Sequence, residues 1–201
     1  MCFCAVSPFA ALINLLLSVF AIARPIQPAG LYQGYAVSNN LYVELLSQAT
    51  GYAWFYTPYL MLGDSLMDAF VRAAQRGVDV RIIMPGVPDK ALVYRMSRSY
   101  YQPLLEASVK IYEYTPGFVH AKGCVVDDKI GTVGTVNLDY RSLFLHFENN
   151  ALFYRSTVLR DLKADFLSTQ SQCMERTLDN IGVSFRKWVV DGLLRIFAPL
   201  C

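Results

Sequence analysis

The stretch from His120 to Glu148 constrains this 201-residue chain more than any other part of it. It begins with His120 and Lys122, which alternate on a strand-like segment, and side chains two apart on a strand point to the same face. A tight turn at residues 127–129 leads into a second apolar run that ends at Asn137. Two short strands joined by a tight turn predict a hairpin, which brings the Asn137 amide back beside the His120 imidazole.

The side chains that this hairpin groups together are suited to a phosphodiester substrate. The neutral imidazole of His120 can attack phosphorus, the ammonium of Lys122 can neutralise the non-bridging oxygens, and the Asn137 amide can donate to the developing charge. This chemistry needs neither a metal nor another cofactor. Glu148 is a candidate to accept a hydrogen bond from the second ring nitrogen of His120 and so to fix its tautomer. Asp127, at the end of the first strand, is expected to hold the loop rather than to touch the substrate.

The spacing of these residues resembles the signature of the phospholipase D superfamily, which reads His-x-Lys, four residues, Asp, six residues, Gly-Thr-x-Asn. The matching residues are His120, Lys122, Asp127, Gly134, Thr135 and Asn137. The flanking segments 112–118 and 137–142 are similar to those of bacterial cardiolipin synthases. The resemblance implies an α/β fold with a mixed, largely parallel sheet flanked by helices, which forms one lobe of a usually two-lobed enzyme.

The resemblance also implies a role for each member of the candidate catalytic set. His120 would form a phosphohistidine intermediate, and Lys122 and Asn137 would bind the phosphate. Glu148 would orient the histidine. Asp127 completes the set as the motif aspartate.

Three further residues are candidates for binding the substrate. Thr135 belongs to the motif, and Arg98 and Arg141 lie where a guanidinium could make forked contacts with a phosphate. Pairing with Asp139 is the alternative for Arg141. An ordinary place on a surface helix is the alternative for Arg98.

The chain carries the motif once, whereas cardiolipin synthases carry it twice, with two histidines facing each other across one site. His146, the other histidine, has no lysine two residues later and no following Gly-Thr-x-Asn. Two alternatives follow. Either two chains assemble one site across a twofold axis, as the small single-motif nucleases of the superfamily do, or the chain is an isolated C-terminal half with a defective site.

The expected reaction is phosphatidyl transfer, in which two phosphatidylglycerol molecules give cardiolipin and glycerol. The alternatives are hydrolysis of a phospholipid or nucleic acid by a single-motif homodimer, and a catalytically silent membrane-associated fragment. The expected partners are phosphatidylglycerol, other anionic phospholipids, a membrane and a second motif-bearing chain. No nucleic acid is expected, because the net charge is only +2. The expected location is the cell membrane, with the catalytic part in the cytoplasm.

The N-terminal part of the chain is strongly apolar, in a chain that is 54% hydrophobic overall. Residues 1–24 have no charge before Arg24, and a span of ~20 apolar residues is long enough to cross a bilayer. A signal peptide, and an unrelated segment upstream of a truncated gene, are the alternatives to this possible transmembrane helix. Residues 25–37 are expected to form a linker, which Pro25, Pro28 and Gly30 mark.

Residues 38–182 are expected to form the catalytic half-domain. Hydrophobic periodicity predicts helices at 41–49, 66–76, 90–107 and 157–173, and strands at 52–56, 78–84, 109–114 and 150–154. The strand–helix–strand spacing over 52–84 predicts a crossover between parallel strands. Residues 183–201 predict an amphipathic C-terminal helix with one charged and one apolar face. That helix is expected either to lie in a bilayer interface or to pack against its own domain.

Overall fold

A computed structural model of the chain describes residues 37–182, 184–196 and 198. The strands are β1 (Tyr52–Tyr56), β2 (Asp79–Pro85), β3 (Lys110–Tyr114), β4 (Gly123–Val126), β5 (Ile130–Gly134), β6 (Asn150–Tyr154) and β7 (Cys173–Arg176). The helices are α2 (Val37–Gln48), α3 (Asp64–Gln75), α4 (Ala91–Arg98), α5 (Tyr101–Glu106), the π-helix η1 (Arg141–Leu145), α6 (Val158–Gln170), α7 (Leu178–Ile181) and α8 (Phe185–Ile196).

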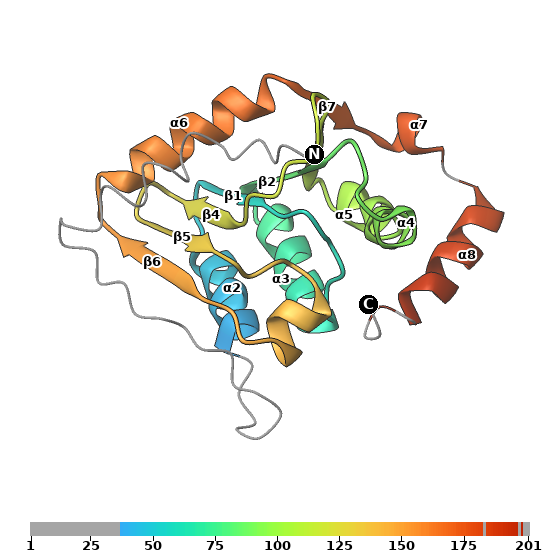
Figure 1. The fold of residues 1–201 in the computed structure, drawn as a ribbon, viewed down its shortest axis with the longest axis horizontal. Coiled ribbons are helices and arrows are strands. Elements are labelled where there is room, and N and C mark those ends of the chain that lie inside the picture. Colours follow the sequence, from blue (N-terminus) through green and yellow to red (C-terminus); the bar gives the residue numbers. More distant parts are fainter. Residues whose placement is uncertain (1–36, 183, 197, 199–201) are drawn as a thin grey trace.

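The strands form one sheet in the order β6-β5-β4-β1-β2-β3-β7, with α2 to α5 on one face and α6 on the other (Figure 1). This confirms the expected mixed α/β sheet flanked by helices, but the sheet is not largely parallel as expected, because most of its strand pairings are antiparallel. β1, β2 and β3 are parallel, as the predicted crossover requires, and the remaining pairings are antiparallel. The parallel part does not extend to β5, because the short turn of residues 127–129 between β4 and β5 can join only antiparallel neighbours.

Alternate side chains of β1 enter two separate cores. On one face the Phe55 ring packs against Phe70 of α3, with ring centroids 4.9 Å apart. On the other face Trp54 stacks on Phe166 of α6 at 5.1 Å. Successive side chains of a strand point to opposite faces. Because both faces of β1 are covered, this central strand is apolar on both sides. Burial of each large side chain contributes roughly 1.5–3 kcal/mol.

The helix expected at 90–107 is two helices, α4 and α5. The break falls at Ser99, whose hydroxyl donates to the carbonyl of Met96 over 2.6 Å. Pro103 explains the restart, since proline is tolerated in the first turn of a helix, where its missing N–H has no partner to lose. The helix expected at 157–173 ends at Gln170, and the chain continues into β7, which was not expected and pairs with β3.

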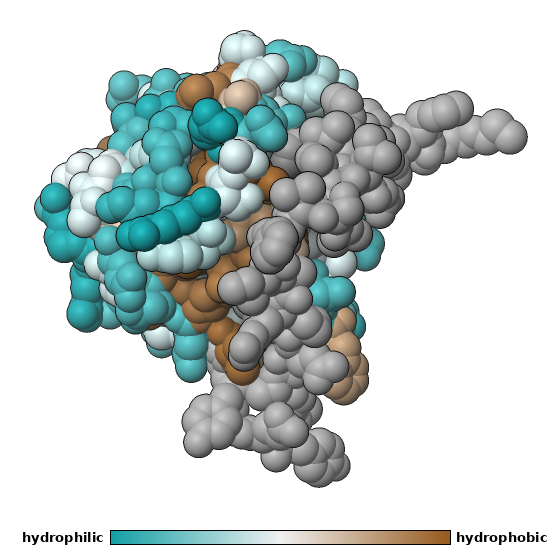
Figure 2. All heavy atoms as spheres, turned by 90° about the vertical axis from the view of Figure 1, so that its left-hand side faces the viewer, coloured by the Kyte–Doolittle hydropathy of each residue, from teal (hydrophilic) through white to brown (hydrophobic). Residues whose placement is uncertain are grey.

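The sheet ends at β6 on one side. Figure 2 shows the molecule from the side that carries β6 and the start of α6. Most of the coloured surface is hydrophilic, and hydrophobic side chains form a band through the middle of this view. β6 begins where β5 ends, because Asn150 pairs with Gly134. This edge of the sheet therefore leads directly to the end of the motif.

The segment expected at 1–24, and nearly all of the linker expected at 25–37, lie outside the described residues. Within the described part of the chain, no helix is both long enough and apolar enough to cross a bilayer.

Candidate active site

The strand register gathers the motif at one edge of the sheet. Tyr56, the last residue of β1, lies opposite Gly123, the first residue of antiparallel β4. Gly123 in turn faces Val133 near the end of β5, and Gly134 faces the first residue of β6. The segments before β4, after β5 and before β6 therefore leave the sheet where the parallel strands end. In α/β sheets this is the edge at which ligands commonly bind.

The motif glycine is required by the close approach of β5 and β6. A Cβ atom on Gly134 would lie 2.0 Å from Oδ1 of Asn150 and 2.2 Å from the carbonyl oxygen of Asn149. Asn150 is itself fixed, because its Nδ2 donates to the hydroxyl of Tyr42 over 2.9 Å. Only glycine fits at such a position.

His120 lies in the segment that leads into β4, and it is exposed. Its ring stacks near Phe118, with ring centroids 5.5 Å apart. Partial burial, reinforced by the positive charge of Lys122, lowers the pKa of the imidazole below its ordinary value. The ring is therefore neutral at pH 7, which is the form that can act as a nucleophile.

Lys122 lies beside His120, as the sequence predicts. Its Nζ donates to the carbonyl oxygen of His120 over 2.8 Å. Burial lowers the pKa of this ammonium to about 8, and the negative charges of Glu148 and Asp139 oppose the shift. Lys122 is thus mostly protonated at pH 7, with two N–H donors left for a substrate.

A hydrogen-bonded chain connects Asn137 to Glu148 through Ser142. The Asn137 amide donates to Oγ of Ser142 over 3.0 Å, and that hydroxyl donates to Oε1 of Glu148 over 2.9 Å. The Ser142 backbone N–H donates to Oδ1 of Asp139 over 2.7 Å. One amide hydrogen of Asn137 is thereby used, which orients the other.

The π-helix η1 makes this chain of contacts possible. The His146 N–H donates to the carbonyl of Arg141, five residues earlier, over 2.8 Å. A single wide turn of this kind is often found at functional sites. Here it brings Ser142 next to Glu148. Sequence analysis did not identify Ser142 as a site residue, although it lies in the flanking segment that resembles cardiolipin synthases.

The predicted hydrogen bond between Glu148 and His120 is not formed. Among the described residues nothing bonds Glu148 to the His120 ring; its Oε1 accepts from Ser142 and lies 3.9 Å from Nδ1 of His146. The link between Glu148 and this part of the motif is electrostatic, because its negative charge acts on the pKa of Lys122.

Asp127 lies at the opposite end of β4 from His120. Its carboxylate accepts from the backbone N–H groups of Thr50, Gly51 and Tyr52 over 2.8, 2.8 and 2.7 Å, and from the Thr50 hydroxyl over 2.9 Å. Burial alone would raise the pKa of Asp127, but these hydrogen bonds together lower it. Asp127 holds the loop before β1, as expected, and its place in the candidate catalytic set is corrected.

Two of the candidate substrate-binding residues, Thr135 and Arg141, follow β5 at the edge of the sheet that carries His120. The Thr135 hydroxyl accepts from the N–H of Asn149 over 2.9 Å, so it joins the segments after β5 and before β6. Arg141 is exposed at the start of η1. Its alternative partner Asp139 is buried and bound by Ser142, and no ion pair joins the two in the described part of the chain.

Arg98 forms an ion pair with a buried carboxylate. Its Nε lies 3.3 Å from Oε1 of Glu113, a carboxylate that is only 1% exposed. Glu113 also accepts from Arg176 and, over 3.0 Å, from the hydroxyl of Tyr101. Arg98 therefore neutralises a buried acid, and its expected role at the substrate stays a prediction.

Replacement of Glu113 by alanine is expected to lower the free energy of unfolding by about 3 kcal/mol, because it leaves the charges of Arg98 and Arg176 without their shared partner. Urea denaturation measures the change. Glu106→Ala, which removes an exposed carboxylate from α5, is the matched control and is expected to change the stability by no more than ~0.5 kcal/mol. Equal losses in the two variants would contradict this account of Glu113.

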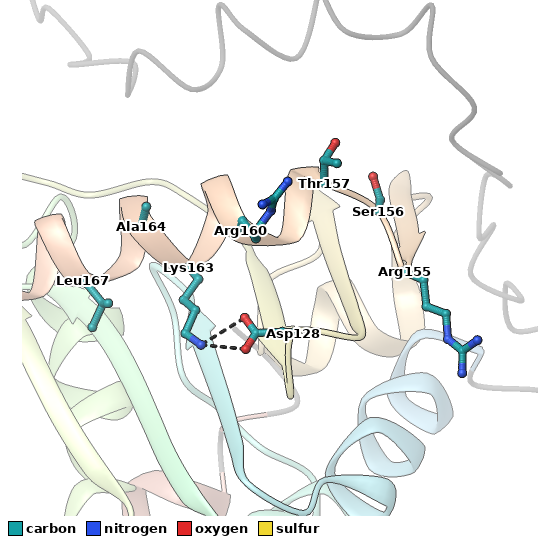
Figure 3. A pocket seen from close by; sticks show the side chains of 8 residues that line it. All are labelled: Asp128, Arg155, Ser156, Thr157, Arg160, Lys163, Ala164 and Leu167. Atoms are coloured by element: carbon teal, nitrogen blue, oxygen red, sulfur yellow. Dashed lines mark hydrogen bonds and ion pairs between the residues drawn. The ribbon is translucent and has the colours of Figure 1, made fainter.

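A second group of cations lies at the far edge of the sheet, around a hollow of about 670 Å³ beside the start of α6. Figure 3 shows Lys163 turned toward Asp128, to which it donates over 2.7 and 3.0 Å. Arg155 and Arg160 point in different directions, away from that pair (Figure 3). These cations do not converge on one point, so the hollow is a weaker candidate for a phosphate site than the edge that carries His120. Among the described residues, no cluster of three or more His, Cys, Asp or Glu side chains could hold a metal ion.

Comparison with solved structures supports the fold described above. Two solved structures have the same fold: a phospholipase D family member, Nuc from Salmonella typhimurium (17% identical, TM-score 0.63, covering 77% of this chain and 99% of that one), and phosphatidylserine synthase from Haemophilus influenzae Rd KW20 (18% identical, TM-score 0.65, covering 89% and 45%).

Sequence comparison identifies the family. A cardiolipin synthase of Geobacillus sp. (strain WCH70) is 39% identical over 171 residues, which are 84% of this chain and 34% of that protein. The chain spans about a third of the length of the curated relatives it matches. Residues 42–169 match the family model described as cardiolipin synthase, PLD-like domain. The chain therefore belongs to the cardiolipin synthase, PLD-like domain family.

Proposed function

We propose that the chain is one lobe of a phosphatidyltransferase of the cardiolipin synthase type, which forms cardiolipin and glycerol from two phosphatidylglycerol molecules. The proposal is carried by the strand register, because the segments that hold His120, Lys122 and Asn137 leave the sheet at the same edge, in a chain of this family. The reaction would take place at the cell membrane, with the catalytic part in the cytoplasm.

In the first step the neutral imidazole of His120 attacks phosphorus of the donor lipid. A P–N bond forms, the bond from phosphorus to the glycerol oxygen breaks, and glycerol leaves after it takes up a proton. The two unused N–H groups of Lys122 and the unused amide hydrogen of Asn137 face the non-bridging oxygens and stabilise their charge.

In the second step the primary hydroxyl of another phosphatidylglycerol attacks the phosphohistidine. The new P–O bond forms as the P–N bond breaks, and the hydroxyl proton passes to a base, which regenerates free His120. The two displacements use the same phosphate contacts, so one site serves both the donor and the acceptor.

The acid that protonates the leaving glycerol is assigned to the histidine of a second motif-bearing chain, in a homodimer or a mixed pair. Two observations support this. His120 is exposed at the sheet edge, and the fold of this chain covers 99% of the Nuc chain but only 45% of the phosphatidylserine synthase chain, as expected for one lobe.

Thin-layer analysis of lipids after incubation of the purified chain with labelled phosphatidylglycerol tests the proposal. Labelled cardiolipin is the expected product. Phosphatidic acid without cardiolipin would instead assign hydrolysis, and cleavage of DNA in a metal-free buffer would assign a nuclease. Activity from a strict monomer, measured by light scattering in mild detergent, would contradict the two-chain site.

Ser142→Ala is expected to lower cardiolipin formation about tenfold, because it removes the hydroxyl that orients the Asn137 amide and binds Glu148. The effect is expected in kcat, since the oriented amide acts on the transition state. Ser99→Ala is the matched control, because Ser99 is also buried and also donates one hydrogen bond, at the end of α4. A merely structural role for Ser142 would lower the stability of both variants and leave kcat unchanged in both.

A further inference from the structure

The C-terminal helix α8 turns its charged side toward the domain. Asp191 is only 7% exposed, and it lines a hollow of about 260 Å³ together with Arg95 and Arg98 of α4. One turn later, the guanidinium carbon of Arg195 lies 5.9 Å from the ring centroid of Tyr100. Asp191 and Arg195 therefore lie on the side of α8 that meets its own domain.

The other side of α8 is apolar and faces away from the domain. Val189, Leu193 and Ile196 are 39, 55 and 69% exposed, and the neighbouring Val190 is exposed as well. Their spacing of three and four residues places them on one stripe of the helix. We call these four residues the α8 stripe. A contiguous aliphatic stripe in water is unfavourable and marks an interaction surface.

A shared hollow joins α8 to the segment that follows the motif. Gly192 and Arg195 line a hollow of about 510 Å³ together with the segment that follows β1 and with Tyr140, the residue before η1. Tyr140 comes three residues after Asn137. Figure 1 shows α8 outside the layer formed by α4 and α5 and away from β6. A surface that binds the α8 stripe would therefore hold the catalytic edge near it.

We propose that the α8 stripe docks on the surface of an anionic phospholipid bilayer. The choice of a bilayer rests on the proposed function and on charge complementarity. Arg186, at the start of the stripe, and Arg95, on the adjacent helix α4, are both exposed and can contact lipid phosphates. The aliphatic side chains then enter the boundary between head groups and acyl chains, in the manner of an interfacial helix. At 12 residues, α8 is too short to span the bilayer.

A polarity-sensitive fluorophore on a single cysteine tests this contact directly. In the full chain, Cys2, Cys4, Cys173 and Cys201 are replaced by serine, the buried Cys124 is kept, and the label is attached in a Leu193→Cys variant. Vesicles of phosphatidylglycerol and phosphatidylcholine are expected to shift its emission to shorter wavelength. The same label in a Leu167→Cys variant, on α6 at a site that is 44% exposed, is expected not to respond.

The absence of a shift at position 193 would overturn the docking, even if another segment carries the protein to the vesicle. Vesicles of phosphatidylcholine alone are expected to bind more weakly, because the arginines then lack an anionic partner. A shift without vesicles that grows with protein concentration, together with a dimer by light scattering, would assign the stripe to a second copy and also overturn the proposal.

The double variant Leu193→Gln, Ile196→Gln is expected to bind vesicles at least roughly tenfold more weakly and to form cardiolipin normally in detergent mixed micelles. Leu167→Gln is the control for both measurements. Unchanged vesicle binding in the double variant would contradict the docking of the α8 stripe on the bilayer. Vesicle binding that responds as expected while mixed micelles yield no cardiolipin would contradict the proposed function alone.

Discussion

Replacing His120 with alanine is expected to reduce cardiolipin formation by at least about a thousandfold, because the covalent intermediate can no longer form. The protein should remain folded, since the imidazole is exposed and no hydrogen bond among the described residues depends on it. Circular dichroism and urea denaturation check the fold, and trapping of labelled phosphate on the protein checks the intermediate. Loss of the label in the variant, at unchanged stability, would place the nucleophile at this position.

His146→Ala is the matched control for that experiment. His146 is also exposed and belongs to the same edge, where its Nδ1 lies 3.9 Å from Oε1 of Glu148. It lacks the lysine partner and the phosphate-binding amide of the motif, so most of the activity is expected to remain. If the two variants lost activity equally, the assignment of the nucleophile from the motif would be wrong. Full activity in His120→Ala would contradict the mechanism in which His120 attacks phosphorus.

The sequence could predict the hairpin because everything that specifies it is local. Asp127 and Asp128 have φ of 52° and 54°, a conformation that aspartate tolerates and that a two-residue hairpin turn requires. Once that turn is set, the pairing of Gly123 with Val133 fixes which ends of the strands meet. His120 and Asn137 then leave the sheet at the same edge, without any further information from the rest of the chain.

The sequence could not predict contacts that depend on how distant segments pack. Arg98 and Glu113 lie in different elements, and their pairing follows from the face on which Glu113 enters the core next to Tyr101. The bond from Ser142 to Glu148 needs the wide turn of η1, which has no clear residue signature. The amphipathic pattern of α8 could be predicted, but its orientation depends on the arginines of α4 that face Asp191.

Lys122→Met is expected to lower cardiolipin formation about a hundredfold to a thousandfold, because the variant keeps the nucleophile and removes the ammonium that stabilises charge on the phosphate. Loss of the positive charge should also raise the pKa of His120 toward its ordinary value, since Lys122 is one cause of its lowering. The residual activity should therefore rise with pH through a higher pH range than in the native protein. Log(kcat/KM) measured against pH reports both effects.

The native protein is expected to show a bell-shaped profile of kcat/KM against pH. Activity rises as His120 loses its proton, below the usual pKa of 6.5, and then falls in two stages, as the acid histidine of the second chain loses its proton and as Lys122 loses its own near its pKa of about 8. Lys122→Arg separates the two groups, because a guanidinium stays charged throughout this range. The variant should be slower but should lose the fall near pH 8. A fall that persists there in Lys122→Arg would mean that another group sets the alkaline limit of the profile, and the role given to this ammonium would have to be abandoned.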